Sequence, residues 1–189
     1  MIRKSKSLNS ETPAVPGWHL ATTNEEAALS ELEWTLLRWH ESYARFTRES
    51  LATVGNVVLS AQEVMILHII RMHDRPKTTS MIANLLNRTD IQNLQYSTRK
   101  LISHKLVSRV KSGRAKSPAM TATPLGRRLC DALAESRRAM LLESLRSLEG
   151  LPERLHAVAK TASMLTALYD QAERAAVRPL PALPKLADV

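Results

Sequence analysis

Few glycines, few aromatic residues and a single cysteine set the first limits on the fold of this chain. Its 189 residues include five glycines, one cysteine and 4% aromatic residues. A strand-rich sandwich or barrel has many turn signals and many aromatic residues, so this composition favours a mainly helical protein. The lone Cys130 excludes an internal disulfide and a cysteine-based zinc cluster, and it favours a reducing, cytoplasmic location.

Long apolar runs and catalytic patterns are also lacking. No run of about 18 apolar residues occurs, so we expect no transmembrane helix and no membrane partner. The histidines lack metal-ligand spacing, and there is no nucleophile–base pair, carboxylate pair or glycine-rich phosphate loop. The sequence therefore predicts no enzyme activity, no metal site and no cofactor. The hydrophobic fraction of 44% is still large enough for a buried core.

Acidic residues are absent from one long central segment. Residues 91–130 contain no Asp or Glu but nine Lys or Arg, whereas the rest of the chain has 18 basic and 18 acidic residues. The whole net charge of +9 therefore comes from this segment. Such self-repulsion destabilises a folded domain unless an anionic partner lies against it, and a nucleic-acid backbone is the obvious polyanion.

Composition and periodicity divide the chain into five parts. Residues 1–23 read as a polar arm without the apolar segment of a secretory signal, and residues 177–189 read as a proline-rich tail. Long helices are predicted within residues 24–54 and 124–176, on either side of a central domain at residues 60–123.

Both long helical regions carry apolar residues at alternating spacings of three and four, which is typical of helices that pack against helices. Packing within one chain is one explanation. We favour a homodimer interface built by both ends of the chain, because the central domain has enough apolar residues for its own core. The predicted interface residues are Leu29, Leu32, Leu36, Leu155, Val158, Leu165 and Tyr169.

Three helices are predicted at the start of the central domain. Ser60 and Glu63 have capping-box spacing and begin a helix that is apolar on most faces. Thr78 or Thr79 begins a short second helix, and Asp90 is expected to cap a third. Four apolar residues of the second helix are expected to face the core: Met81, Ile82, Leu85 and Leu86.

A basic β-hairpin is predicted after the third helix. Residues 107–110 and 119–122 are the expected strands, because valines lie in the first and Ser-Gly and Ser-Pro turn signals separate the two. Thr123 as an N-cap and Pro124 at the first helical position then begin a helix that runs to about Leu148.

A short helix, a second helix with a polar outer face and a basic hairpin occur in the order of a winged helix-turn-helix. Helices of this kind enter the DNA major groove, where Gln and Asn pair with adenine edges. The predicted base-reading residues are Gln92, Asn93, Gln95 and Tyr96. The predicted phosphate or wing contacts are Thr79, Arg99, Lys100, Lys111, Arg114 and Lys116.

The segment from about Ser60 to Leu129 resembles the winged helix-turn-helix core of MarR-type transcriptional regulators. LISHKLVSR and ATPLGRRL are similar to the family patterns L-x-x-x-G-L-V-x-R and L-T-x-x-G. Two departures stand out: Lys105 occupies the family's glycine position, and the hairpin lacks the Asp that orients the family's wing arginine. The resemblance implies a homodimer that pairs through long helices at both ends of the chain, with double-stranded DNA as its partner.

The resemblance also implies a small aromatic effector, bound between the dimer helices and the DNA-binding lobe. Four residues of the first long helix would form an aromatic wall for it, with ordinary packing as the alternative: Trp34, Trp39, His40 and Tyr43. For Cys130 and His68 we favour core positions over redox or metal sensing.

We therefore predict a mainly α fold with a small β-wing, in which a winged helix-turn-helix core is flanked by long N- and C-terminal dimerisation helices. The predicted function is a homodimeric transcriptional regulator, a repressor that binds a pseudo-palindromic operator and is released by an effector. Two alternatives stay open: a protein-interaction module, and a nucleic-acid-binding module without sequence preference. The amide-rich helix face favours base reading over protein docking, where aromatic anchors are expected.

Overall fold

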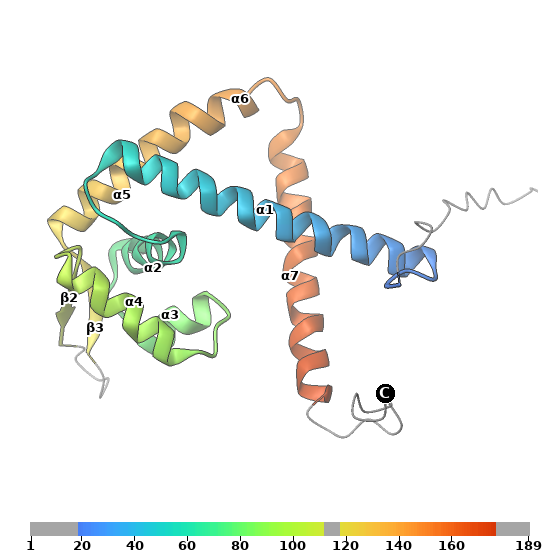
Figure 1. The fold of residues 1–189 in the computed structure, drawn as a ribbon, viewed down its shortest axis with the longest axis horizontal. Helices are drawn as coiled ribbons and strands as arrows, with labels where there is room; N and C mark the ends of the chain where they lie inside the picture. Colours follow the sequence, from blue (N-terminus) through green and yellow to red (C-terminus); the bar gives the residue numbers. More distant parts are fainter. Residues whose placement is uncertain (1–18, 112–117, 177–189) are drawn as a thin grey trace, which may run out of the picture. The chain divides into compact units, whose positions relative to one another are not determined.

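The structure, a computed structural model, describes residues 19–111 and 118–176. The chain divides into two units between Arg137 and Arg138, and each unit is described by itself. The first unit holds helices α1 to α5 and a three-stranded sheet, and the second holds a π-helix, α6 and α7 (Figure 1). Within the described ranges, none of the helices combines the length and the hydropathy that a membrane span requires.

Helix α1 (Asn24–Val54) begins at a capping box made by Thr23 and Glu26. The Thr23 hydroxyl accepts from the Glu26 backbone N–H at 3.2 Å, and the Glu26 carboxylate accepts from the Thr23 N–H at 3.1 Å. Near its C-terminal end α1 buries Leu51 against α2 and α5. The helix matches the one predicted from periodicity, while its role in dimerisation stays a prediction.

Helix α2 (Ala61–Arg71) lies at the centre of the first unit, in contact with α1, α3, α4, α5 and β3. Ser60 and Glu63 form the predicted capping box at its start. Val64, Ile66 and Ile70 are at most 1% exposed. A helix that is apolar on most faces is thus covered on most faces, as the sequence predicts.

A buried lysine stabilises the turn after α2. The chain passes through the 3-10 turn η1 (Met72–Asp74) into β1 (Lys77–Thr78). Lys77 is 4% exposed, and its ammonium donates to the carbonyl oxygens of Ile70 at 3.1 Å, of Arg75 at 3.0 Å and of Met72. Burial lowers the pKa of Lys77 because it disfavours the charged ammonium. The carbonyl groups at the C-terminal end of α2 stabilise that charge and so partly offset the cost of burial.

Helix α3 (Thr79–Leu85) corrects one sequence-based prediction. Thr78 is its cap, since the hydroxyl accepts from the Met81 backbone N–H at 3.3 Å. Ile82 is fully buried, but Met81 and Leu85 are 48% and 49% exposed, so the prediction that they face inward is wrong. They are one turn apart, on a side of this two-turn helix that faces solvent, while Ile82 and Ala83 face the core.

Helix α4 (Ile91–Ser103) starts without the predicted cap. The Asp90 side chain makes no hydrogen bond to the backbone of α4. It accepts instead from Arg88 Nε at 2.7 Å and from Asn93 Nδ2 at 3.1 Å. A guanidinium offers a carboxylate stronger, charge-assisted bonds than a backbone amide does, which explains the difference. Ile91, in the first turn of α4, is 38% exposed.

The predicted hairpin is confirmed by β2 (Val107–Val110) and β3 (Ala119–Ala122), which pair antiparallel. Strand β1, which the sequence did not predict, is the third strand of this sheet. Its Thr78 pairs with Ala119 of β3, so the strand order is β1-β3-β2. The hairpin tip, with the predicted contacts Arg114 and Lys116, lies outside the described residues.

Helix α5 (Pro124–Arg137) begins as predicted, with Thr123 Oγ1 accepting from the Gly126 N–H at 3.1 Å. The helix predicted to run to about Leu148 changes type after Arg137, and its last α-helical residue is Leu145. The chain enters a π-helix, η2 (Arg138–Leu142), and a short α6 (Glu143–Leu145). A π-helical turn shifts the side-chain register, so 3.6-residue periodicity cannot hold through it.

The second unit ends in α7 (Leu151–Ala176), which follows Gly150 at a φ of 66°. No residue of α7 is buried within this unit. Leu155 and Val158 are 53% and 55% exposed.

Candidate nucleic-acid interface

One side of α4 is packed and the other is open. The packed side consists of Leu94, Ser97, Thr98 and Leu101, all buried. The open side carries all four predicted base-reading residues, and each is exposed: Gln92, Asn93, Gln95 and Tyr96. Exposed amides in the first two turns of the second helix of a helix-turn-helix lie where such a helix approaches base edges.

Asp90 orients one of these amides. Its carboxylate binds Arg88 and accepts from Asn93 Nδ2 at 3.1 Å. The hydrogen bonds from Arg88 and then from Asn93 lower the pKa of Asp90 to about 2. Asp90 is therefore ionised at neutral pH and holds Asn93 by its amide nitrogen.

A polar hollow lies between α3, α4 and the base of the hairpin. Its volume is about 430 Å³, and Arg99 from α4 and Arg109 from β2 both line it. Hydroxyl and amide groups from Thr79, Ser80 and Gln95 complete its polar wall. None of the described residues that line this hollow is acidic. Two guanidinium groups with hydroxyl donors around them form a surface suited to a phosphate group.

The basic surface continues along the hairpin. Arg99 and Arg109 also line a second hollow of about 440 Å³, together with Lys105. Lys111 follows β2 and is exposed. Arg109 was not among the predicted contacts. The alternation of side chains along residues 107–110 was the signal that could have placed it on the same face as Lys111.

Lys100 does not join Arg99 and Arg109. Its ammonium donates to Glu63 Oε2 at 2.9 Å, and its side chain is 34% exposed. Helical periodicity puts Lys100 on the outer side of α4, but the long side chain reaches back to α2. In the structure, Lys100 therefore forms an ion pair with Glu63, whereas the sequence predicted a phosphate contact for it.

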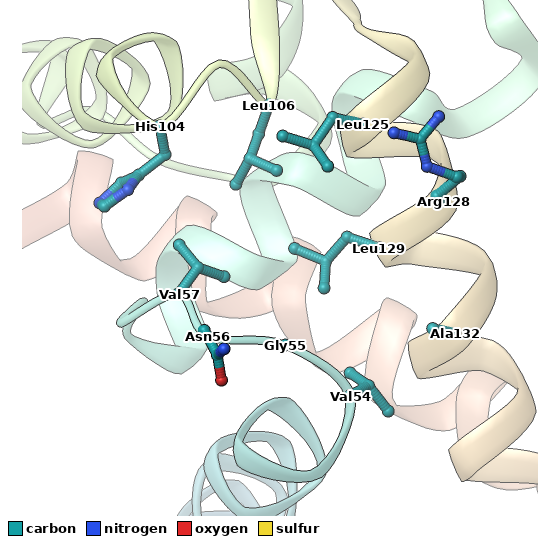
Figure 2. Close-up of a pocket in the computed structure, with 10 residues that line it drawn as sticks. All are labelled: Val54, Gly55, Asn56, Val57, His104, Leu106, Leu125, Arg128, Leu129 and Ala132. Atoms are coloured by element: carbon teal, nitrogen blue, oxygen red, sulfur yellow. The ribbon is translucent and has the colours of Figure 1, made fainter.

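An apolar pocket of about 530 Å³ lies between the end of α1, the end of α4 and the start of α5 (Figure 2). Leu125 and Leu129 point from α5 toward Leu106 and Val57, whereas the guanidinium of Arg128 points away from this apolar centre. Its described lining is mostly aliphatic, with Asn56, His104 and Arg128 as the polar members.

The residues predicted for an effector site lie elsewhere on α1. Trp34 and Trp39 are 54% and 66% exposed, and His40 is also exposed. The ring centroids of Trp39 and Tyr43 are 6.2 Å apart with an interplanar angle of 37°. None of the four lines the apolar pocket of Figure 2, so their role as an effector site stays a prediction.

Cys130 occupies a core position. It is 5% exposed, and burial raises the pKa of its thiol to about 11. His68 is partly buried in α2, and burial, with smaller effects of Arg71 and Arg137, lowers its pKa. Across residues 19–111 and 118–176, no three His, Cys, Asp or Glu side chains are grouped as metal ligands.

Residues 59–126 match a protein family described as "Winged helix DNA-binding domain". Three solved structures share the fold. The transcriptional regulator BldR from Sulfolobus solfataricus has a TM-score of 0.61 and 22% identity, over 75% of this chain and 99% of BldR. The MarR family transcription regulator SP03579 has a TM-score of 0.62 and 15% identity, over 79% of this chain and 95% of its own. The Staphylococcus aureus MepR–DNA complex has a TM-score of 0.59 and 18% identity, over 72% of this chain and 95% of MepR.

No curated protein matches the chain by sequence. The structural likenesses nevertheless define its fold class, which is the winged helix-turn-helix, and residues 59–126 match the DNA-binding domain of that class. Within that class the predicted resemblance to MarR-type regulators is confirmed at the level of the fold.

Proposed function

We propose that this protein is a sequence-specific regulator of transcription that binds double-stranded DNA as a homodimer. The observation that carries the proposal is the hollow between α3, α4 and the hairpin. Arg99 and Arg109 both line it, and none of its described lining residues is acidic. A backbone phosphate fits between these guanidinium groups. Helix α4 then lies in the major groove with its exposed amides at the base edges.

The two kinds of contact have separate residues. Arg99, Arg109, Lys111 and Thr79 contact phosphate groups and set the register of the protein on the duplex. The outer side of α4 reads the sequence through Gln92, Asn93, Gln95 and Tyr96. The solved DNA complex of MepR, which has the same fold, supports DNA as the partner of this fold.

Dimerisation is part of the same proposal. Leu29 on α1 is 40% exposed, and Leu155 and Val158 on α7 are 53% and 55% exposed. Apolar side chains at helical spacing on a water-exposed face indicate a partner surface. A two-fold axis would place two α4 helices in successive major grooves, about 34 Å apart.

Sedimentation equilibrium tests the dimer. We expect the wild type to be dimeric at micromolar concentration and the double variant Leu155→Glu, Val158→Glu to be monomeric. A double substitution to Glu at Ala167 and Gln171, exposed positions on the opposite side of the same helix, is the matched control. A monomeric wild type would contradict this part of the proposal.

Repression and its release by a small aromatic effector complete the proposal. The exposed indoles of Trp34 and Trp39 support an aromatic binding surface on α1. A ligand there would quench tryptophan fluorescence and release bound DNA at the same concentration, and Trp39→Leu would weaken both effects. Quenching without DNA release would mean that the ligand binds α1 but does not regulate DNA binding, which contradicts this part of the proposal.

Selection from a random DNA pool, followed by titration between 50 and 200 mM KCl, tests the main function. We expect an enriched inverted repeat and a logarithm of affinity that falls linearly with the logarithm of salt concentration, by about 0.9 per neutralised phosphate. Binding without an enriched sequence would favour the non-specific alternative. Absence of binding would favour the protein-interaction alternative.

A further inference from the structure

A buried carboxylate connects the start of α2 to α4. Glu63 is 5% exposed. Its Oε2 atom accepts one hydrogen bond from the Ser60 backbone N–H at 2.8 Å and another from Lys100 Nζ at 2.9 Å. Lys100 lies 37 residues further along the chain, in the third turn of α4. One oxygen atom thus joins two helices that are distant in sequence.

The charge on Glu63 is not needed for capping. A glutamine at the same capping-box position accepts the same bond from the N-cap residue. A buried carboxylate destabilises a fold unless a cation pairs with it, and Lys100 supplies that cation. Burial opposes ionisation of Glu63, but the hydrogen bonds from Lys100 and Ser60 outweigh it and lower the pKa. The pair is therefore ionic at neutral pH.

The packed side of α4 combines the apolar Leu94 and Leu101 with the small polar residues Ser97 and Thr98. Leu94 and Leu101 are fully buried and set which side of α4 faces the core, but neither makes a bond to a particular atom of another helix. A charge-assisted hydrogen bond is directional. The Glu63–Lys100 pair adds such a bond between α4 and the start of α2, and so limits small rotations of α4 that would redirect the amides of its first two turns.

On the basis of the proposed function, we infer that Lys100 is a positioning residue for sequence reading, held by Glu63, and not a phosphate contact. Arg99 is its natural comparison, because the adjacent residue carries the same charge but lines the polar hollow. Loss of Arg99 removes a contact with DNA. Loss of Lys100 changes the orientation of α4.

The first experiment compares Lys100→Gln with Arg99→Gln on two duplexes, one enriched by the wild type from a random pool and one with its bases scrambled. Arg99→Gln should lower the salt slope by about 1 and weaken binding of both duplexes similarly. Lys100→Gln should leave the slope unchanged and reduce the preference for the enriched duplex roughly fivefold, the lower end of the effect of one misplaced bidentate contact. A slope that falls in Lys100→Gln as in Arg99→Gln would overturn the inference, as would an unchanged preference.

Glu63→Gln changes the partner of Lys100 and so distinguishes a positioning role of Lys100 from a phosphate contact. It retains the capping box, so we expect the same loss of preference as in Lys100→Gln, with no further loss in the double variant. If Lys100 contacts phosphate instead, Glu63→Gln releases its ammonium and raises both affinity and salt slope.

Lys100→Arg is the rescue variant, since a guanidinium can also donate to Glu63, and it should restore the preference. Urea midpoints establish that each variant is folded. If Lys100→Gln does not fold, Glu63→Gln and Lys100→Arg decide the matter. A wild type that binds no duplex contradicts the proposed function itself, whereas a binding wild type with the opposite pattern of variants contradicts only this inference.

Discussion

Gly126 of α5 lies directly against the backbone of Leu106. A Cβ atom at Gly126 would stand 2.1 Å from the Leu106 carbonyl oxygen. The same carbonyl accepts a hydrogen bond from the Thr123 N–H at 3.0 Å, so it cannot move away without breaking that bond. The start of α5 is thereby fixed on the turn that links α4 to the hairpin.

Substitution of Gly126 by Ala should therefore destabilise the protein by roughly 1–3 kcal/mol, the usual range of overpacking in a well-packed site. Urea denaturation followed by circular dichroism measures the change. Gly55→Ala is the matched control, because a Cβ there would be 3.4 Å from its nearest neighbour, an ordinary contact with a side-chain atom of Leu129. Equal losses in the two variants would show that the contact with Leu106 is unimportant.

Lys105 has a φ of 57°, in the left-handed region, at the position where MarR-type sequences have glycine. Lys105→Gly should raise the unfolding free energy by about 1 kcal/mol relative to Lys105→Ala, because glycine adopts this conformation without strain. The alanine variant loses the same charge but retains the strain, so the comparison isolates the backbone effect. Identical urea midpoints for the two variants would argue against strain at this residue.

Arg109→Gln and Lys111→Gln should each lower the salt slope of DNA binding by about 1, since each removes one of the proposed phosphate contacts. Arg38→Gln on α1 removes the same charge at an exposed position away from the hollow and should leave the slope unchanged. Fluorescence anisotropy titrations between 50 and 200 mM KCl give the slopes. A similar change in Arg38→Gln would mean that only net charge matters.

Asp90 should contribute to stability in a pH-dependent way. Hydrogen bonds from Arg88 and Asn93 hold its pKa at about 2, below the value of about 3.9 in an unfolded chain. A depressed pKa stabilises the fold above that unfolded value, and the contribution is lost as the pH falls toward 2. The stability difference between wild type and Asp90→Asn should shrink from pH 5 to pH 3 in urea titrations. A difference that stays constant would contradict the assignment.

Cys130 should be unreactive in the folded protein. Burial raises the pKa of its thiol to about 11, and only the thiolate reacts readily. Labelling with Ellman's reagent at pH 8 should be at least about tenfold slower in buffer than in 8 M urea. Rapid labelling of the native protein would reopen a redox role for this residue.

Local signals predicted much of the fold. Capping residues such as Ser60 and Thr123 fix where helices begin through bonds to residues only three positions away, so the sequence displays them directly. The hairpin was predictable for the same reason, since its two strands are close in sequence. The exposed side of α4 followed from helical periodicity alone.

Contacts between distant segments were not predictable. Strand β1 has only two residues, too few for an alternating pattern, and it forms because Lys77 lies opposite Met120. Periodicity placed Lys100 on the outer side of α4, but no local signal shows that its side chain returns to Glu63. The contribution of Arg109 to the hollow likewise depends on how β2 and α4 pack.

Strand β3 lies between β1 and β2, and Thr78 both pairs with β3 and caps α3. The base of the wing is therefore joined through hydrogen bonds to the helix-turn-helix, without a hinge between them. A duplex that does not match their spacing has to adapt by its own bending or twisting. Operators with flexible pyrimidine–purine steps would then bind more tightly, even at base pairs that no side chain contacts.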